Sequence, residues 1–166
     1  THDLAQFEIP KFEPNLARRL LLSIAKIETP SLLEIARANH KTPRQIERYI
    51  DAFKALFVVY EIPPYQSSTG KSLFYLFDAG IASYAGADEN KCAKIFFLNE
   101  CFSQYSYAGE MRPDVFYYCS SKGSKIDLVV QARENTYAVL LSMEESHSTY
   151  SLRASKAFRI KTPDNQ

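Results

Sequence analysis

Apolar residues recur at helical spacing near the start of the chain. One stripe consists of Leu16, Leu20, Leu21, Ile24 and Ile27. It predicts a first helix that begins near Asn15, after an extended, proline-containing segment over residues 1–14. Because proline suits the first turn of a helix, Pro30 indicates that a second helix follows over about residues 31–38.

The third predicted helix carries a clear start signal. Thr42 is a suitable N-cap and Pro43 a suitable first residue, so we expect this helix to run from there to about Ala55. Its expected buried stripe consists of Ile46, Tyr49, Ile50 and Phe53. The remaining side of the helix is polar and is expected to face water.

After residue 55 the pattern changes from helical to strand-like. Two β-prone runs, over about residues 56–62 and 72–77, flank the polar loop 66–71 and predict a hairpin. Three helices followed by a two-stranded hairpin is the element order of a winged helix-turn-helix. We therefore expect such a module over residues 15–78.

Residues 79–166 are expected to form a second, α/β domain. The predicted elements are a helical turn (79–85), a helix (90–104), strands at 115–119, 125–131 and 136–142, a short helix (150–156) and a last strand (158–161). On the helix over 90–104, Ala93, Phe96, Phe97 and Cys101 are expected to form the buried face. The fold class of the whole chain is therefore predicted to be α/β, in the broader sense α+β.

Composition limits the functional classes. Lysine and arginine total 20 against 19 for aspartate and glutamate, so any DNA contact must come from a local basic patch. The cysteines Cys92, Cys101 and Cys119 are odd in number and lack C-x-x-C spacing, which argues against a disulfide framework and a zinc site and favours the cytoplasm. No apolar run reaches the ~20 residues needed to cross a membrane, so no membrane partner is expected.

The third predicted helix offers a candidate nucleic-acid interface. The expected contacts are Arg44, Gln45 and Arg48 on its outward side, Lys41 before it and Lys71 at the tip of the wing. Glu47 and Asp51 share that helix, and residues 1–78 hold ten basic and nine acidic side chains. A protein-interaction role, with another domain or with a second copy of the chain, therefore stays open beside DNA contact.

Three blocks of the sequence together resemble a known family. They read PSLLEIARANHKTPRQIERYIDAFKALFVVYEIPPY, SLFYLFDAGIASYAG and FYYCSSKGSKIDLVV. Their order and spacing are similar to the C-terminal region of bacterial and archaeal AAA-type P-loop ATPases, in which a winged helix precedes a domain of unknown function with a restriction-endonuclease-like fold. The likeness extends over about residues 4–160.

The resemblance implies that this chain is the C-terminal fragment of such an ATPase. An ATP-binding domain would lie upstream and would be a partner of this region. ATP and Mg²⁺ are expected only there, because the chain contains no G-x-x-x-x-G-K-[ST] motif to hold phosphates. The expected function is a non-catalytic regulatory module that contacts DNA or protein.

The resemblance also implies a nuclease-like domain, over residues 79–166, whose active site has degenerated. The family pattern has an acidic residue on a helix, an aspartate on one strand and Glu-x-Lys on the next. Glu100 and Asp127 match the first two positions, whereas Leu140, Leu141 and Ser142 stand in place of Glu-x-Lys. An earlier helix glutamate is replaced by Lys94. Since Mg²⁺ needs converging carboxylates, we expect no metal site and no catalysis.

Two alternatives stay open for this domain. One is a divergent Mg²⁺-dependent nuclease that uses Asp127 and Glu100. Glu144, Glu145 and His147, which we expect to lie in a solvated loop, would be able to bind a metal together with Asp127. The other gives Asp127 a structural role, as an edge-strand charge that pairs with Lys125 or Lys122.

Overall fold

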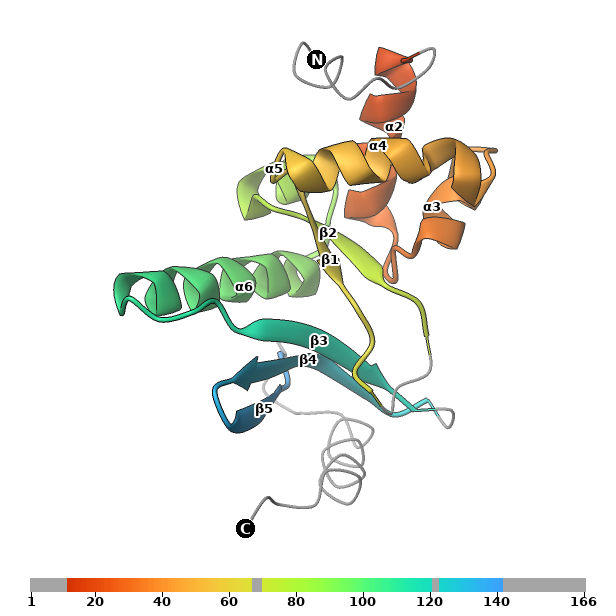
Figure 1. Cartoon of the computed structure of the whole chain (residues 1–166). Coiled ribbons are helices and arrows are strands. Elements are labelled where there is room, and N and C mark those ends of the chain that lie inside the picture. Colours follow the sequence, from red (N-terminus) through yellow and green to blue (C-terminus); the bar gives the residue numbers. More distant parts are fainter. Residues whose placement is uncertain (1–11, 67–69, 121–122, 142–166) are drawn as a thin grey trace. The chain divides into compact units, whose positions relative to one another are not determined.

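The computed structural model describes residues 12–66, 70–120 and 123–141 (Figure 1). Helices and two small antiparallel sheets make it a mixed α and β fold, as the sequence predicts at that level. Two compact units are present: Thr1–Glu61 with Ser72–Phe96, and Ile62–Lys71 with Phe97–Gln166. Over the described ranges, no helix combines the length and apolar character that a membrane span requires.

The first unit begins with three helices, α2 (Pro14–Lys26), α3 (Leu32–Ala38) and α4 (Pro43–Ala55). Pro14 is the first residue of α2, and the Ser31 side chain caps α3 by accepting a hydrogen bond from the Glu34 N–H at 3.3 Å. The strands β1 (Val59–Ile62) and β2 (Leu73–Leu76) follow and pair with each other. Two further helices are α5 (Ala79–Tyr84) and α6 (Glu89–Tyr107), which runs through the unit boundary.

The core of the first unit joins all three N-terminal helices. Its fully buried side chains include Leu20, Ile24, Ile35, Ile46 and Phe53. The stripe predicted for α4 is confirmed, since all four of its residues are buried. Ile27 is only half-buried, because α2 ends before it and the backbone is extended there.

Two polar side chains of the first unit are buried at helix ends. Asn39 follows α3, and its Nδ2 donates to the Ile35 carbonyl at 2.9 Å and to Ser23 Oγ at 2.8 Å. Lys91 lies on α6, and its Nζ donates to the carbonyls of Ile24 and, at 2.6 Å, Ile27. These carbonyls belong to the C-terminal end of α2, where a cation is favourable. Burial lowers the pKa of Lys91 to about 8.

Two predicted element boundaries and one predicted buried face are wrong. The first strand begins at Val59 rather than near residue 56, because Leu56 caps α4 and Phe57 takes a left-handed conformation with φ of 54°. Helix α6 runs to Tyr107, three residues beyond the predicted end. Phe96, which was expected on its buried face, is exposed, and Lys91, Ile95 and Leu98 are buried instead.

The second unit contains a three-stranded antiparallel sheet of β3 (Asp114–Cys119), β4 (Lys125–Ala132) and β5 (Asn135–Val139), with β4 in the centre (Figure 1). Phe116 pairs with Val129 and Tyr118 with Ile126, so two residues of β4 lie opposite Tyr117. This bulge brings Ile126 and Val129 into one buried cluster with Tyr118 and Tyr65. The helix and strand predicted over 150–161 lie outside the described residues.

The segment after β1 leaves the hairpin and joins β3. The Tyr65 N–H donates to the Tyr117 carbonyl at 2.7 Å, and the Tyr117 N–H donates to the Pro63 carbonyl at 3.1 Å. The Tyr117 hydroxyl donates to the Lys71 carbonyl at 2.8 Å and passes so close to Gly70 that a Cβ there would lie 2.1 Å from it. Residues 63–65 and 70–71 thereby contact β3, at the edge of the three-stranded sheet within the second unit.

Candidate functional site

The basic residues predicted to contact nucleic acid lie at the N-terminal end of α4. Arg44, Gln45 and Arg48 are exposed, and Lys41 is half-buried in the turn before the helix. Neither arginine, nor Lys41, takes part in an ion pair with another residue of the described ranges. The helix therefore presents cations to solvent, as its periodicity predicts.

Gln45 has a structural role in the start of α4. Its side-chain oxygen accepts hydrogen bonds from the Thr42 N–H at 2.8 Å and from Thr42 Oγ1 at 3.2 Å. A glutamine that reads adenine uses its oxygen and its nitrogen together. Base contact by Gln45 would therefore compete with the cap of its own helix, a cost that the sequence prediction did not include.

The exposed face of α4 carries both signs of charge. Arg44 and Arg48 share it with Glu47 and Asp51, which are also exposed. Each arginine is followed three positions later by an acidic residue, so the four charges sum to zero along two turns. Phosphate binding depends on an excess of cations, and these four side chains provide none.

Lys71, the fifth predicted contact, belongs to the second unit, whereas the other four belong to the first. Its side chain is exposed, and its carbonyl accepts the Tyr117 hydroxyl. The structural role of this residue is thus carried by its backbone, at the point where the loop after β1 meets β3.

Asp127 lies on β4 and contacts the backbone. Its Oδ2 accepts a hydrogen bond from the Leu141 N–H at 3.0 Å, just beyond the end of β5. The edge position expected for Asp127 is wrong, because β4 is the central strand of its sheet. The expected pairing of Asp127 with Lys125 or Lys122 stays a prediction. Asp127 lies at the bulge opposite Tyr117, and its hydrogen bond to Leu141 fixes the backbone just after β5 ends at Val139.

The other nuclease-like positions do not converge on a metal site within the described part of the chain. Glu100 is exposed on α6, and Leu140 packs against the buried cluster around Tyr118. In residues 12–66, 70–120 and 123–141, no group of three His, Cys, Asp or Glu side chains is arranged to hold a metal ion. Ser142, Glu144, Glu145 and His147 lie outside the described residues.

A comparison with known proteins found no matching family model, no similar curated protein and no similar solved structure. The likeness to AAA-type ATPases stays a prediction.

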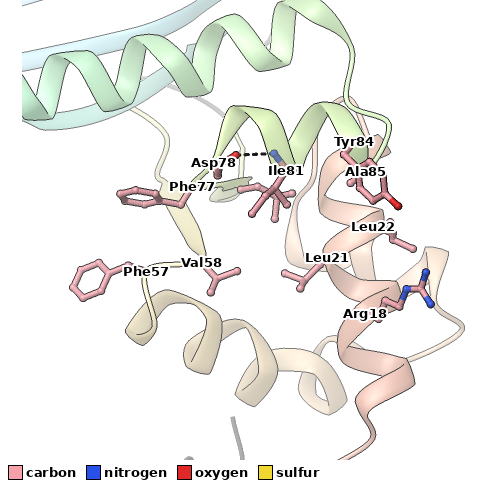
Figure 2. Close-up of a pocket in the computed structure, with 11 residues that line it drawn as sticks. Arg18, Leu21, Leu22, Phe57, Val58, Phe77, Asp78, Ile81, Tyr84 and Ala85 are labelled. Atoms are coloured by element: carbon pink, nitrogen blue, oxygen red, sulfur yellow. Dashed lines mark hydrogen bonds between the residues drawn. The ribbon is translucent and has the colours of Figure 1, made fainter. Parts of the chain in front are cut away.

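An apolar surface of the first unit was not predicted. Four large apolar side chains surround one cavity of about 290 Å³ and are exposed: Phe57 by 69%, Phe77 by 38%, Ile81 by 63% and Tyr84 by 95%. We call this cavity the apolar groove; its lining also includes Arg18, Leu21, Leu22, Val58, Leu76, Asp78 and Ala85 (Figure 2). These residues come from four separate stretches of sequence, so no periodicity indicates that they meet.

Proposed function

We propose that this chain is a non-catalytic regulatory module that acts through contact with another protein. In this proposal the first three helices and the β1–β2 hairpin form a winged helix-turn-helix, and the following residues form a restriction-endonuclease-like domain without an active site. The tight packing of α3 against α4, with Ala36 and Ile46 fully buried, supports the helix-turn-helix part.

The observation that carries the proposal is the apolar groove. Large apolar side chains exposed around one cavity mark protein contact sites, since water contact with that surface is unfavourable. The charged alternative, the outward face of α4, is balanced in sign and has one of its polar side chains, Gln45, committed to the helix cap. Protein contact therefore has more support than DNA contact.

We further propose that the parent protein is an AAA-type ATPase and that its ATP-binding domain is one partner. The support is the order of three sequence blocks. Sequencing the reading frame upstream of the Thr1 codon tests this directly. We expect a G-x-x-x-x-G-K-[ST] motif there, and an upstream region without any nucleotide-binding motif would contradict the proposed family.

DNA contact by α4 is the second candidate function. It is favoured by Lys41, Arg44 and Arg48, which form no ion pair with the residues described. Fluorescence anisotropy with labelled duplex and single-stranded DNA at low salt tests it. Binding that weakens in Arg44→Ala and Arg48→Ala would give α4 a nucleic-acid role, whereas Glu47→Ala serves as the matched charge control.

We assign Asp127 a structural role, supported by its hydrogen bond to the Leu141 N–H. Incubation of the protein with plasmid and Mg²⁺ or Mn²⁺ tests this against the alternative of a divergent nuclease. We expect no cleavage. Cleavage that disappears in both Asp127→Ala and Glu100→Ala would make the protein an enzyme and overturn the proposal.

A further inference from the structure

We propose that the apolar groove binds an amphipathic helix of a partner protein whose apolar face is flanked by acidic residues. This inference rests on the proposed function, contact with protein, and adds the chemistry of the partner. The groove lies wholly within the first unit, between α2, α5 and the connection from α4 to β1.

The walls of the groove are apolar and meet from separate elements. Leu21 projects from α2, Val58 from the connection after α4, and Ile81 from α5, all toward the same gap (Figure 2). Phe57 and Arg18 lie at its borders. A partner side chain inserted between these walls would remove apolar surface from water on both molecules.

The polar groups of the groove do not fit a small-molecule site. Such sites combine an apolar lining with a few polar groups that converge on the ligand. Here the Asp78 carboxylate accepts the Ile81 N–H at 2.6 Å as the cap of α5, and Arg18 is exposed at the border. Phe57 and Tyr84 also project too far into solvent for a ligand inside the cavity to cover them. A larger partner fits this surface better.

Helices border most of the groove, which favours a helical occupant. Where β2 ends at Leu76 in the lining, the following Phe77 N–H already donates to the Val58 carbonyl at 2.9 Å. A partner strand needs unpaired backbone groups along a sheet edge, whereas an amphipathic helix binds through side chains at positions i, i+3, i+4 and i+7. The contacts offered by α2, α5 and Val58 are side chains.

The charge along the groove sets the sign of the partner. Helix α2, which forms one wall, contains three basic residues, Arg18, Arg19 and Lys26, and no acidic residue. All three are exposed, and none forms an ion pair with a residue of the described ranges. Of the three, Arg18 lines the groove, and Lys26 lies against Gly86, next to Ala85 of the lining. Helix α5, the opposite wall, has no charged side chain, and its acidic N-cap Asp78 accepts the Ile81 N–H. Acidic residues on the side of the partner that faces α2 would therefore complement the groove.

The test is a binding titration of the whole chain with labelled helical peptides. The probe is a peptide of about five helical turns, with leucines at i, i+3, i+4 and i+7 spacing and glutamates on both flanks. One control peptide has the same composition in scrambled order, and a second replaces every glutamate with lysine. Fluorescence anisotropy gives the dissociation constant for each.

We expect the acidic amphipathic peptide to bind at least about tenfold more tightly than either control peptide. Ile81→Ala and Tyr84→Ala should each weaken binding at least about fivefold, because truncating a buried anchor removes its apolar contacts. Arg18→Glu should weaken binding of the acidic peptide and strengthen binding of the lysine peptide. The matched control is Tyr107→Ala, since Tyr107 is 83% exposed but lies outside the groove.

Three results would overturn the inference: no binding of the acidic peptide, equal binding of the scrambled peptide, or binding that Ile81→Ala and Tyr84→Ala leave unchanged. Sedimentation of the protein alone adds one more. Self-association that Tyr84→Ala abolishes, without peptide binding, would assign the groove to a second copy. The presence of a nucleotide-binding motif upstream does not depend on the result of the peptide titration. The proposed ATPase family and the proposed helical partner can therefore fail independently.

Discussion

The first unit has two exposed surfaces that differ in kind. The outward face of α4 is charged and balanced, with Arg44 and Arg48 beside Glu47 and Asp51. The apolar groove gathers four exposed large apolar side chains next to the basic helix α2. Exposed charge pairs contribute little to binding free energy because water screens them, whereas apolar anchors that become buried dominate it. We therefore expect the apolar groove, which the sequence does not reveal, to bind a partner more tightly than the outward face of α4.

The two surfaces also differ in how many elements form them. Helix α4 buries a regular stripe, so its outward face is fixed by helical period alone. The groove exists only because α2, α5 and the end of α4 meet in three dimensions. Its integrity therefore depends on how the helices are held together.

The largest expected effect separates the two faces of α4. Ile46 is fully buried, and Ile46→Ala should lower the free energy of unfolding by about 2–5 kcal/mol through lost contacts and a cavity. Arg44→Ala, on the outward face, should change it by less than about 0.5 kcal/mol. Urea denaturation of both variants measures the difference. Similar losses in the two variants would mean that the outward face also supports the fold.

A smaller effect tests how α2 is held. Lys91 is 5% exposed and its pKa is lowered to about 8 from 10.5, so the folded chain binds fewer protons than the unfolded chain between these values. The free energy of unfolding should therefore rise with pH in this window, by up to about 3 kcal/mol from Lys91. This part of the stability is fully present above pH 10.5 and is lost as pH falls through about 8.

The matched variant for that measurement is Lys91→Met, which keeps the length of the side chain and removes the titration. The stability of the original protein relative to Lys91→Met should increase between about pH 7.5 and pH 10. Other titrating groups are common to both proteins and cancel in the comparison. A difference that stays constant over this range would contradict the burial of Lys91 at the end of α2.

The smallest effect concerns the start of α4. Gln45→Ala removes the acceptor of the Thr42 N–H and should cost about 1 kcal/mol of stability. Thermal unfolding measures it, with Arg48→Ala as an exposed control on the same helix. If Gln45→Ala left the stability unchanged but reduced DNA binding, Gln45 would be a nucleic-acid contact instead of a cap.

Much of the first unit is predictable because local signals there agree with the tertiary structure. Thr42 and Pro43 start α4, and apolar residues at 46, 49, 50 and 53 specify its buried side. The prediction for α6 failed at its buried face, because Lys91 stands where an apolar residue would reveal the stripe. A lysine that satisfies helix-end carbonyls cannot be distinguished from a surface lysine by its sequence position.

The candidate sites were predictable only in part. The exposure of Arg44 and Arg48 follows from the helical period. The period does not show that the Gln45 side chain caps the helix, so Gln45 was predicted as a nucleic-acid contact. For Asp127, the central position of β4 and the bulge depend on strand order and register. The apolar groove depends on residues more than sixty positions apart, such as Arg18 and Ala85, and no local pattern joins them.

A paired titration of this chain at about 0.15 M salt, where screening is close to physiological, compares protein binding at the apolar groove with DNA binding at α4. One titration uses the acidic amphipathic peptide and the other a labelled DNA duplex, each with the original protein, Tyr84→Ala and the double variant Arg44→Ala/Arg48→Ala. We expect peptide binding that only Tyr84→Ala weakens, and DNA binding weaker than peptide binding. DNA binding that is the tighter of the two and is lost in the double variant would contradict it.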